Sequence, residues 1–491
     1  MKKTQFVSLN KIIQYLMLGA VAMSLGYFLK EGIVAIACGI FLILLLFKKV
    51  DNLVLFLIFW LFIYNYYLGQ NWIHNELISK YLIKGQFYTI ITFIVFVRKG
   101  WFRDEFSKKL FSWVLIFLMI MLFSNILHLN FNPGFINQVY FIFMFFLILN
   151  IPGNKFFERN LLSLVVAIGL LEVVVSILQV SQILAPPIKL SVDSQFLWEA
   201  GLDDVASGTF GAGSSNVTSW LSTILFFTFF SFGVYRKKVI IVLASFIFML
   251  QYVTVDSKTA LVVSILAFIL LLYNLKIFTF YKVRNYFYVS LIISFVFITQ
   301  IMITSYYENI FNIGVGAVNT NVANSAELVL SNIQDWGKIA GFKNITEDYI
   351  DTNPFYLLIG YGISNFDYDT NGGRIENMDT PIMQLNNITR SRSSFISIYG
   401  ELGIPGLLML IWLFLILFRN IQKRNYNTVL GNSFKQSGIA VLFGSMIFMF
   451  LYGGHKYNDM AFLMFFILYA SVLRIENKYI ETQFLLEKNG K

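Results

Sequence analysis

Long apolar runs are the feature that most constrains the fold of this 491-residue chain. Runs of about 18 apolar residues predict membrane-spanning helices, because a helix of that length crosses the hydrocarbon core of a bilayer. We expect such helices at 12–29, 32–47, 53–69, 82–97, 110–127, 135–150, 161–184, 216–234, 239–255, 259–275, 286–305, 394–418, 437–453 and 457–473. The sequence therefore predicts an all-α integral membrane protein with about 12–14 transmembrane helices, nearer 14.

Composition supports this class, since 57% of the residues are hydrophobic and only 13% are charged. The single cysteine, Cys38, lies in a predicted helix, so no disulfide within the chain is possible. The N-terminal stretch MKKTQF is basic, but no small-residue cleavage site closes the first apolar run. We therefore expect this run to remain in the protein as a helix.

The positions of lysine and arginine predict the orientation. When the N-terminus is placed in the cytoplasm, every cytoplasmic segment carries at least two basic residues, as the positive-inside rule expects. Both termini are then cytoplasmic, in a multi-pass protein of the cell membrane. The net charge of +10 thus reflects topology. Nucleic acid is not an expected partner, because no basic stripe interleaved with aromatic residues lies on a soluble domain.

Two predicted external segments are much longer than the other connections. They cover residues 185–215 and residues 306–393, the second lying before the twelfth helix. Connections of this length in a compact protein are usually functional or disordered. The second is too rich in aromatic residues for plain disorder, so we expect an ordered lid over the outer face.

An acidic residue inside an apolar helix suggests function, because charge is costly in lipid. In SRSSFISIYGELGIPG, Glu401 follows Ser394 by seven residues, or roughly 10 Å along a helix. It is expected to need a partner, and Arg390 or Arg392 is the nearest cation in sequence. Glu172, inside the seventh predicted helix, is either a structural carboxyl or a functional one, and the sequence does not decide between them.

Other cations and polar residues stand near the outer ends of predicted helices. Lys80 and Lys84 share one helix face, where lipid head-group contacts are the favoured interpretation and substrate binding the other. Ser257 and Lys258 stand at the start of the tenth helix. They are interpreted either as an anion-binding site or as ordinary residues of the membrane interface. The stretch GTFGAGSSN, ending at Asn216, opens the eighth helix as a binding turn or as a flexible turn with an N-cap.

No pattern predicts a metal or another cofactor. DYDTNG at 367–372 matches the first half of a calcium loop, but its twelfth position is Met378 instead of glutamate. A polar turn is therefore favoured there. His74, His128 and His455 do not cluster in the sequence, and zinc spacings, Walker motifs and G-x-S-x-G are absent.

Taken in order, four stretches resemble the O-antigen ligase and polymerase superfamily. They are GTFGAGSSN, SKTALVVSILAF, NPFYLLIGYGISNF on the long external segment, and RSSFISIYGELGIPG. The last matches the family's His-Asn/Ser-x9-Gly-x-x-Gly spacing, with Arg392 in place of the histidine. Lys258 stands where the family often has arginine, which keeps the charge but loses the bidentate fork.

The resemblance implies an enzyme that joins polyprenyl-diphosphate-linked repeat units into an O-antigen, capsular or exopolysaccharide chain on the outer membrane face. The missing histidine, which is tied to the ligase reaction, favours a polymerase. Arg390, Arg392 and Lys258 would bind the diphosphate, with Arg374, Ser257, Asn216 and Lys84 as further substrate-binding candidates. Glu401 would serve as base or orient the cations, and Asp204 or Asp203 is the alternative base.

The resemblance also implies partners and divides the chain. The partners are the lipid-linked oligosaccharide, the bilayer, a chain-length regulator and a flippase. Residues 205–420, including 306–393, form the family-like core; residues 1–204 hold the first seven helices and the first external loop, and residues 421–491 the last two helices and a cytoplasmic tail.

Two alternatives stay open. A ligase would transfer finished glycan to a terminal acceptor, whereas a flippase would move the lipid-linked oligosaccharide without chemistry. The gathering of charged candidates at the outer face, under a long loop, favours an enzyme over a flippase.

Overall fold

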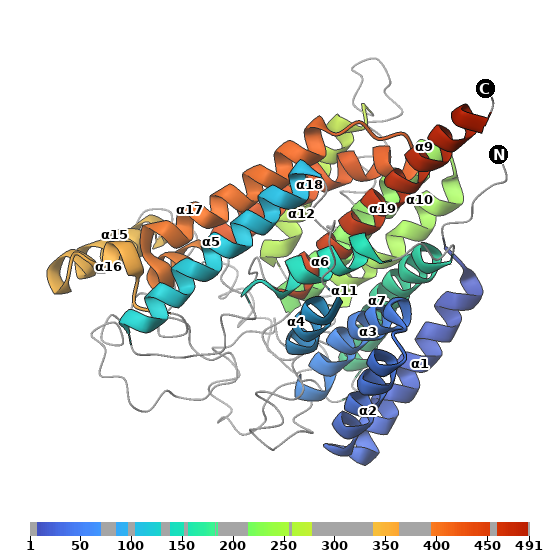
Figure 1. The fold of residues 1–491 in the computed structure, drawn as a ribbon, viewed down its shortest axis with the longest axis horizontal. Coiled ribbons are helices and arrows are strands. Elements are labelled where there is room, and N and C mark those ends of the chain that lie inside the picture. The colour runs from blue at the N-terminus through green and yellow to red at the C-terminus, as the bar shows by residue number, and fades with distance from the viewer. Residues whose placement is uncertain are drawn as a thin grey trace, which may run out of the picture.

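The computed structural model describes residues 7–69, 85–96, 104–128, 138–151, 156–181, 183–184, 215–254, 258–276, 337–362, 394–451 and 459–489. Within these ranges the chain is helical, apart from short turns, and contains no strand (Figure 1). The helices are α1 Leu9–Leu29, α2 Gly32–Leu46, α3 Val50–Gly69, α4 Gly85–Phe96, α5 Glu105–Leu127, α6 Tyr140–Asn150, α7 Phe157–Val180, α9 Ser215–Arg236, α10 Val239–Ser245, η4 Phe246–Met249, α11 Leu250–Thr254, α12 Lys258–Asn274, α15 Gly337–Thr352, α16 Tyr356–Ile359, α17 Ser394–Lys423, α18 Val429–Leu451 and α19 Met460–Asn489.

The predicted class, an all-α membrane protein, is confirmed by these helices. Every predicted apolar run except 286–305, which lies outside the described residues, falls on a helical segment. By length and composition, 7 helices among the described residues could each cross a membrane: α1, α5, α7, α9, α17, α18 and α19. The other runs within the described residues form shorter apolar helices of 10–17 residues, so a total of fourteen spans stays a prediction.

Helices α9 and α19 form the centre of the bundle, whereas α1 lies at its edge. The most apolar window of α19 is 89% buried, against 17% for α1. Ring contacts join α19 to α6, since the ring centroids of Phe141 and Phe466 lie 4.9 Å apart and those of Phe145 and Tyr469 lie 5.8 Å apart. The abundant phenylalanines thus fill the space between helices, where van der Waals packing drives association in lipid.

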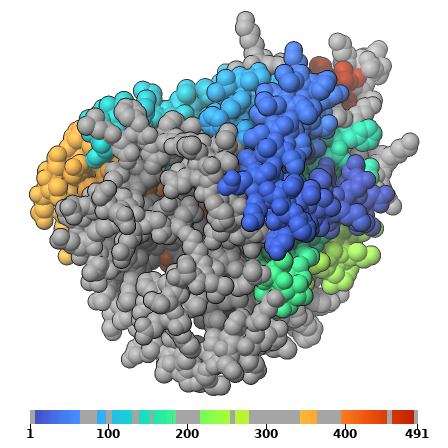
Figure 2. All heavy atoms as spheres, turned by 90° about the horizontal axis from the view of Figure 1, so that it is seen from below, coloured from blue at the N-terminus to red at the C-terminus, as the bar shows by residue number. Residues whose placement is uncertain are grey.

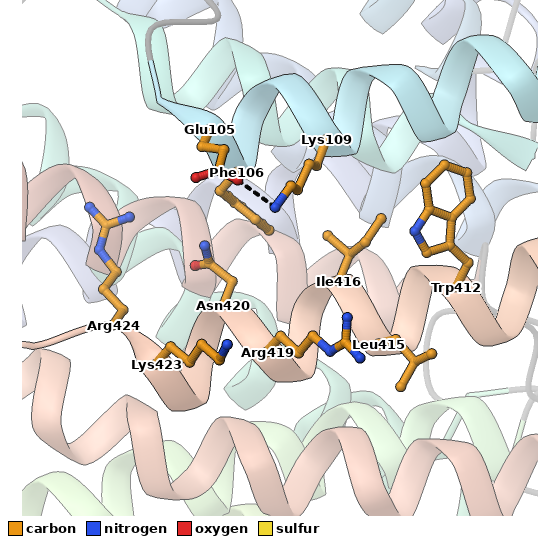
Figure 3. Close-up of a pocket in the computed structure, with 10 residues that line it drawn as sticks. All are labelled: Glu105, Phe106, Lys109, Trp412, Leu415, Ile416, Arg419, Asn420, Lys423 and Arg424. Carbon is orange, nitrogen blue, oxygen red and sulfur yellow. Dashed lines mark ion pairs between the residues drawn. The ribbon is translucent and has the colours of Figure 1, made fainter.

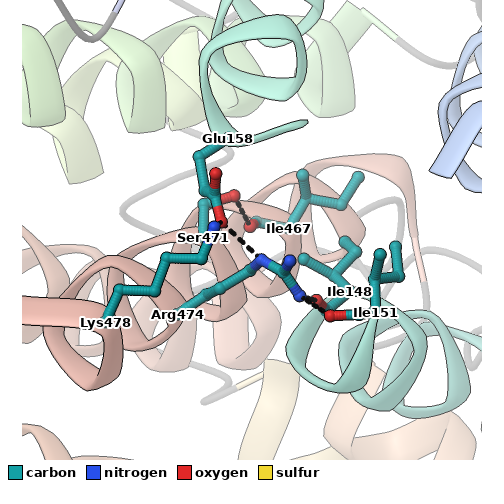
Figure 4. A network of polar contacts seen from close by, with 7 residues as sticks. All are labelled: Ile148, Ile151, Glu158, Ile467, Ser471, Arg474 and Lys478. Atoms are coloured by element: carbon teal, nitrogen blue, oxygen red, sulfur yellow. Dashed lines mark hydrogen bonds and ion pairs between the residues drawn. The ribbon is translucent and has the colours of Figure 1, made fainter. Parts of the chain in front are cut away.

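A buried ionic network ties α19 to the starts and ends of two other helices (Figure 4). Arg474 Nε donates to Glu158 Oε1 at 2.6 Å, and Lys478 Nζ lies 2.5 Å from the same oxygen. The Arg474 guanidinium also donates to the carbonyl oxygens of Ile148, in the last turn of α6, and Ile151, just past its end. One arginine thereby satisfies a carboxylate and two backbone carbonyls inside the bundle.

Replacing Arg474 is expected to destabilise the fold much more than replacing Lys478. Arg474→Met leaves the Ile148 and Ile151 carbonyls buried without this donor, and each buried acceptor left unsatisfied costs about 1–3 kcal/mol. Lys478→Met is the matched control, because that side chain is 36% exposed and Arg474 remains on Glu158. Thermal unfolding of both purified variants in detergent measures the difference, and equal melting temperatures would contradict this role.

The start of α1, the start of α7 and the end of α17, which carry predicted cytoplasmic basic residues, lie at one end of the bundle with α19. The backbone N–H of Ser8, just before α1, donates to Ser163 near the start of α7 at 3.0 Å. Glu158, at the start of α7, binds Arg474, and Arg424 beyond α17 donates to Asn477 at 2.9 Å. This arrangement agrees with a chain whose first helix begins, and whose last helix ends, on the same side of the bundle.

Candidate functional site

Helix α17 is broken at Gly403, and this break shapes the candidate site. The apolar run predicted over 394–418 is thus helical, with a kink at Gly403 that the prediction did not include. Gly403 has φ 64° and ψ −157°, a conformation open to glycine, and Pro405 follows two residues later. Proline has no N–H to donate to the carbonyl four residues earlier, and its ring clashes with that carbonyl in a continuous helix. It is therefore favoured in the first turn of a new helix. Glu401 accordingly lies at the end of a short helix, beside the break.

The carbonyls exposed by this break are satisfied by the segment that follows α16. The N–H of Gly362 donates to the carbonyl oxygen of Glu401 at 3.0 Å. In a continuous helix this oxygen would accept from the N–H of residue 405, but Pro405 has none. The N–H of Tyr361 donates to the carbonyl of Gly400 at 2.9 Å. The GYG turn of the 353–362 segment thus completes the broken helix of the 394–406 segment, and we call this pair of segments the interlock.

Glycines allow the two backbones of the interlock to touch. Gly360 has φ +63°, and a Cβ there would lie 2.3 Å from the carbonyl of Glu401. A Cβ on Gly403 would lie 2.4 Å from the carbonyl oxygen of Leu357. Both positions are therefore restricted to glycine by close approach as well as by conformation.

Tyrosines surround the interlock. The Tyr349 hydroxyl, on α15, is positioned to donate to the carbonyl oxygens of Tyr399 and Gly400, each at 2.8 Å. Its ring centroid lies 4.7 Å from that of Tyr361 and 5.5 Å from that of Tyr399. Burial raises the pKa of the Tyr349 hydroxyl, and the neighbouring Tyr399, Asp348 and Glu401 add to that rise in this order, so this hydroxyl stays protonated. The cluster holds α15 against the end of α17.

Asp348 meets solvent at the rim of this cluster. It accepts a hydrogen bond from the Tyr361 hydroxyl. Partial burial, and then the neighbouring Asp351 carboxylate, raise the pKa of Asp348 above its ordinary value. This carboxylate was not among the residues singled out from the sequence.

The end of α5 supports the interlock from the other side. The Ser124 hydroxyl donates to the carbonyl of Ile359 at 2.9 Å, and a ring nitrogen of His128 lies 2.9 Å from the carbonyl oxygen of Gly360. The His128 ring also stacks on Tyr356, with centroids 5.7 Å apart. Figure 2 shows this part of the chain, in yellow-orange and cyan, at one edge of the molecule. His128, an isolated histidine in the sequence, thus positions the GYG turn.

Several predicted site residues lie outside the described part of the chain. They are Arg392, Arg390, Arg374, Asp204, Asp203, Ser257 and Lys84. Lys80, His74, His455 and the 367–372 turn also lie outside it. The side chain of Lys258 is not described, but its backbone begins α12. Of the predicted residues, Glu401 and Asn216 are described and buried, with 8% and 3% of their surface exposed.

The structure places the starts of α9, α12 and α17 at one end of the bundle. The hydroxyls of Thr223 on α9 and Ser264 on α12 lie 3.0 Å apart, and the ring centroids of Phe227 and Phe268 lie 5.8 Å apart, so these helices run parallel. Their first residues, including Asn216 and Lys258, therefore begin at the same end.

Ring contacts of α18 show that α17 begins at the same end as α9. Near the end of α18, Phe448 lies against Trp220 of α9, with centroids 5.5 Å apart, and Phe450 lies 6.0 Å from Phe395 of α17. Three of the four stretches that carry the family resemblance thus open helices at one end, and the fourth lies in the interlock.

Two other features lie away from this end. Glu172 is fully buried on α7, one turn before Ser176, whose hydroxyl accepts from Gln251 at 2.6 Å. A cavity of about 530 Å³ lies between α5 and α17 at their basic ends. Because α5 and α17 run antiparallel, with Trp113 Nε1 donating to the carbonyl of Met409, this cavity is remote from Glu401. Among the described residues, no group of three or more His, Cys, Asp or Glu side chains could hold a metal.

Comparisons with protein-family models and with curated proteins find no match to this chain.

Proposed function

We propose that this protein is a polysaccharide polymerase that lengthens a glycan carried on polyprenyl diphosphate. The observation that carries the proposal is the interlock. Two stretches of the family resemblance, separated in the sequence by residues 363–393, meet backbone to backbone and hold the buried Glu401 at the end of the bundle where α9, α12 and α17 begin. A rigid support for a carboxylate at a membrane surface is what a lipid-linked substrate requires.

The proposed reaction is a glycosyl transfer without a nucleotide. A hydroxyl oxygen of the acceptor sugar forms a bond to the anomeric carbon of the donor sugar, and the bond from that carbon to the diphosphate oxygen breaks. The electron pair leaves with polyprenyl diphosphate, and the hydroxyl proton passes to a carboxylate. Glu401 is our candidate for this base, and Arg390, Arg392 and Lys258 for the cations that stabilise the departing diphosphate.

The lipid diphosphate is itself the activated donor, so the proposal needs no cofactor. The reacting groups would meet at the outer face of the cell membrane. A flippase and a chain-length regulator would act before and beside the enzyme.

The test in cells is the length of the surface and lipid-linked glycan. In a strain lacking the protein, we expect single repeat units on the lipid and no ladder, and wild-type protein should restore the ladder. Arg392→Ala should fail to restore it, since removing a cation from the leaving group costs on the order of a hundredfold or more in rate. Lys343→Ala is the matched control, because it removes an exposed cation from α15.

Other outcomes identify the alternatives. Long lipid-linked polymer that never reaches its final acceptor would indicate a ligase. Repeat units held on the inner leaflet would indicate a flippase and would exclude both enzyme functions. A full ladder with Arg392→Ala at matched expression would remove that residue from the proposed site.

A further inference from the structure

A groove between α5 and α17 joins a basic end to an apolar end. It is the cavity of about 530 Å³ at the basic ends of these helices (Figure 3). Lys109 on α5 and Arg419, Lys423 and Arg424 on or beside α17 line its polar part. Trp412 and Leu415, which lie closer to the start of α17, line its apolar part. The groove belongs to the opposite end of the bundle from the interlock.

The cations of the groove differ in whether another side chain already pairs with them. Lys109 pairs with Glu105 at 2.5 Å, and Arg424 donates to the neutral Asn477 side chain. Arg419 and Lys423 are exposed, and neither makes an ion pair with another described residue. They stand four residues apart, so they share a helix face and can contact one anionic group together.

The apolar part of the groove suits an acyl chain. Trp412 is 36% exposed and Leu415 is 45% exposed, and both lie on a helix long and apolar enough to span a membrane, so their exposed surface would face lipid. Trp412 precedes Arg419 by seven residues, roughly 10 Å along the helix axis. The large indole ring of Trp412 offers apolar surface on the membrane side of these cations. The groove therefore offers cations and apolar surface at the spacing of a head group and the start of its chain.

We propose that this groove binds one anionic phospholipid. The phosphate lies between Arg419 and Lys423, and an acyl chain follows Trp412 and Leu415. Charge complementarity selects an anionic ligand, and the apolar half selects a lipid over a soluble anion. The predicted topology places the groove in the cytoplasmic leaflet, where anionic lipids attract basic segments. This site is independent of the proposed glycosyl transfer.

Native mass spectrometry of the full-length protein in detergent, with phosphatidylglycerol and phosphatidylcholine added separately, tests the site. We expect Arg419→Gln with Lys423→Gln to lower the affinity for phosphatidylglycerol by roughly tenfold and to leave phosphatidylcholine binding unchanged. Lys49→Gln with Lys108→Gln is the matched control, since it removes two exposed basic residues outside the groove. Equal losses in both double variants would overturn the site, because general surface charge would then explain the binding.

Two further measurements separate a lipid from a free phosphate and do not require the charge variants. Glycerol phosphate should fail to displace phosphatidylglycerol, and efficient displacement would show that the acyl chain is not bound. Phosphatidylglycerol with brominated acyl chains should quench the fluorescence of wild-type protein more than that of Trp412→Phe. Equal quenching of the two proteins would overturn the placement of the chain beside Trp412.

Discussion

Gly403→Ala is expected to destabilise the protein by about 3 kcal/mol or more, which would sharply reduce its amount in the membrane. Two effects add. With φ 64° and ψ −157°, Gly403 has a backbone conformation that is essentially restricted to glycine and costs other residues about 1–3 kcal/mol. A Cβ there would also lie 2.4 Å from the backbone oxygen of Leu357. Neither backbone can yield without breaking the hydrogen bonds from Tyr361 and Gly362 to α17. Thermal unfolding in detergent and the amount of protein in membranes measure the effect.

Gly39→Ala provides the control for this prediction. Gly39 lies within α2, and a Cβ there meets no atom within 4 Å. Alanine has the better helix propensity by about 1 kcal/mol, so this variant should match or exceed wild type in stability. If Gly403→Ala were as stable as Gly39→Ala, the interlock as described here would be wrong.

Glu401→Gln is expected to keep the fold and to remove most of the activity. Glutamine has nearly the same shape, so the backbone hydrogen bonds of Glu401 and Gly400 remain. If Glu401 accepts the hydroxyl proton, its loss should lower the rate by about a hundredfold to ten-thousandfold, the usual contribution of a general base. Glu347→Gln, at an exposed position on α15, should leave the rate unchanged.

The readout for Glu401 is the rate of chain growth at matched protein amount and matched melting temperature. Wild-type rates for Glu401→Gln would exclude it as the base and leave Asp204 or Asp203 as the candidate. A variant that melts early would instead indicate that Glu401 is structural, and Glu401→Asp would then show the same early melting.

The sequence predicted the helical class well, because apolar runs of membrane length have few other solutions. It placed helix boundaries less well where polar residues cap or extend a helix. Helix α18 was expected from residue 437 but begins at Val429, because the buried Glu476 carboxylate accepts from the N–H groups of Asn427 and Thr428 just before that helix. A capping partner nearly fifty residues away in the chain cannot be read from local periodicity.

The candidate site shows the same limit. Gly403 followed by Pro405 is a local sign of a helix break, and it could have been used to predict one. What no local pattern indicates is the partner of the freed carbonyls, which comes from the turn at residues 360–362. Tyr349 and His128 were missed for the same reason, since their roles depend on contacts between distant segments.

The most direct test of the central claim is polymerisation by the purified protein alone. The protein would be reconstituted in lipid vesicles with a polyprenyl-diphosphate-linked repeat unit, without any nucleotide sugar, and the products separated by size. We expect lipid-linked chains of two or more repeats together with released polyprenyl diphosphate, and neither product with Glu401→Gln. Unchanged repeat units with folded wild-type protein, or units merely moved across the bilayer, would contradict it.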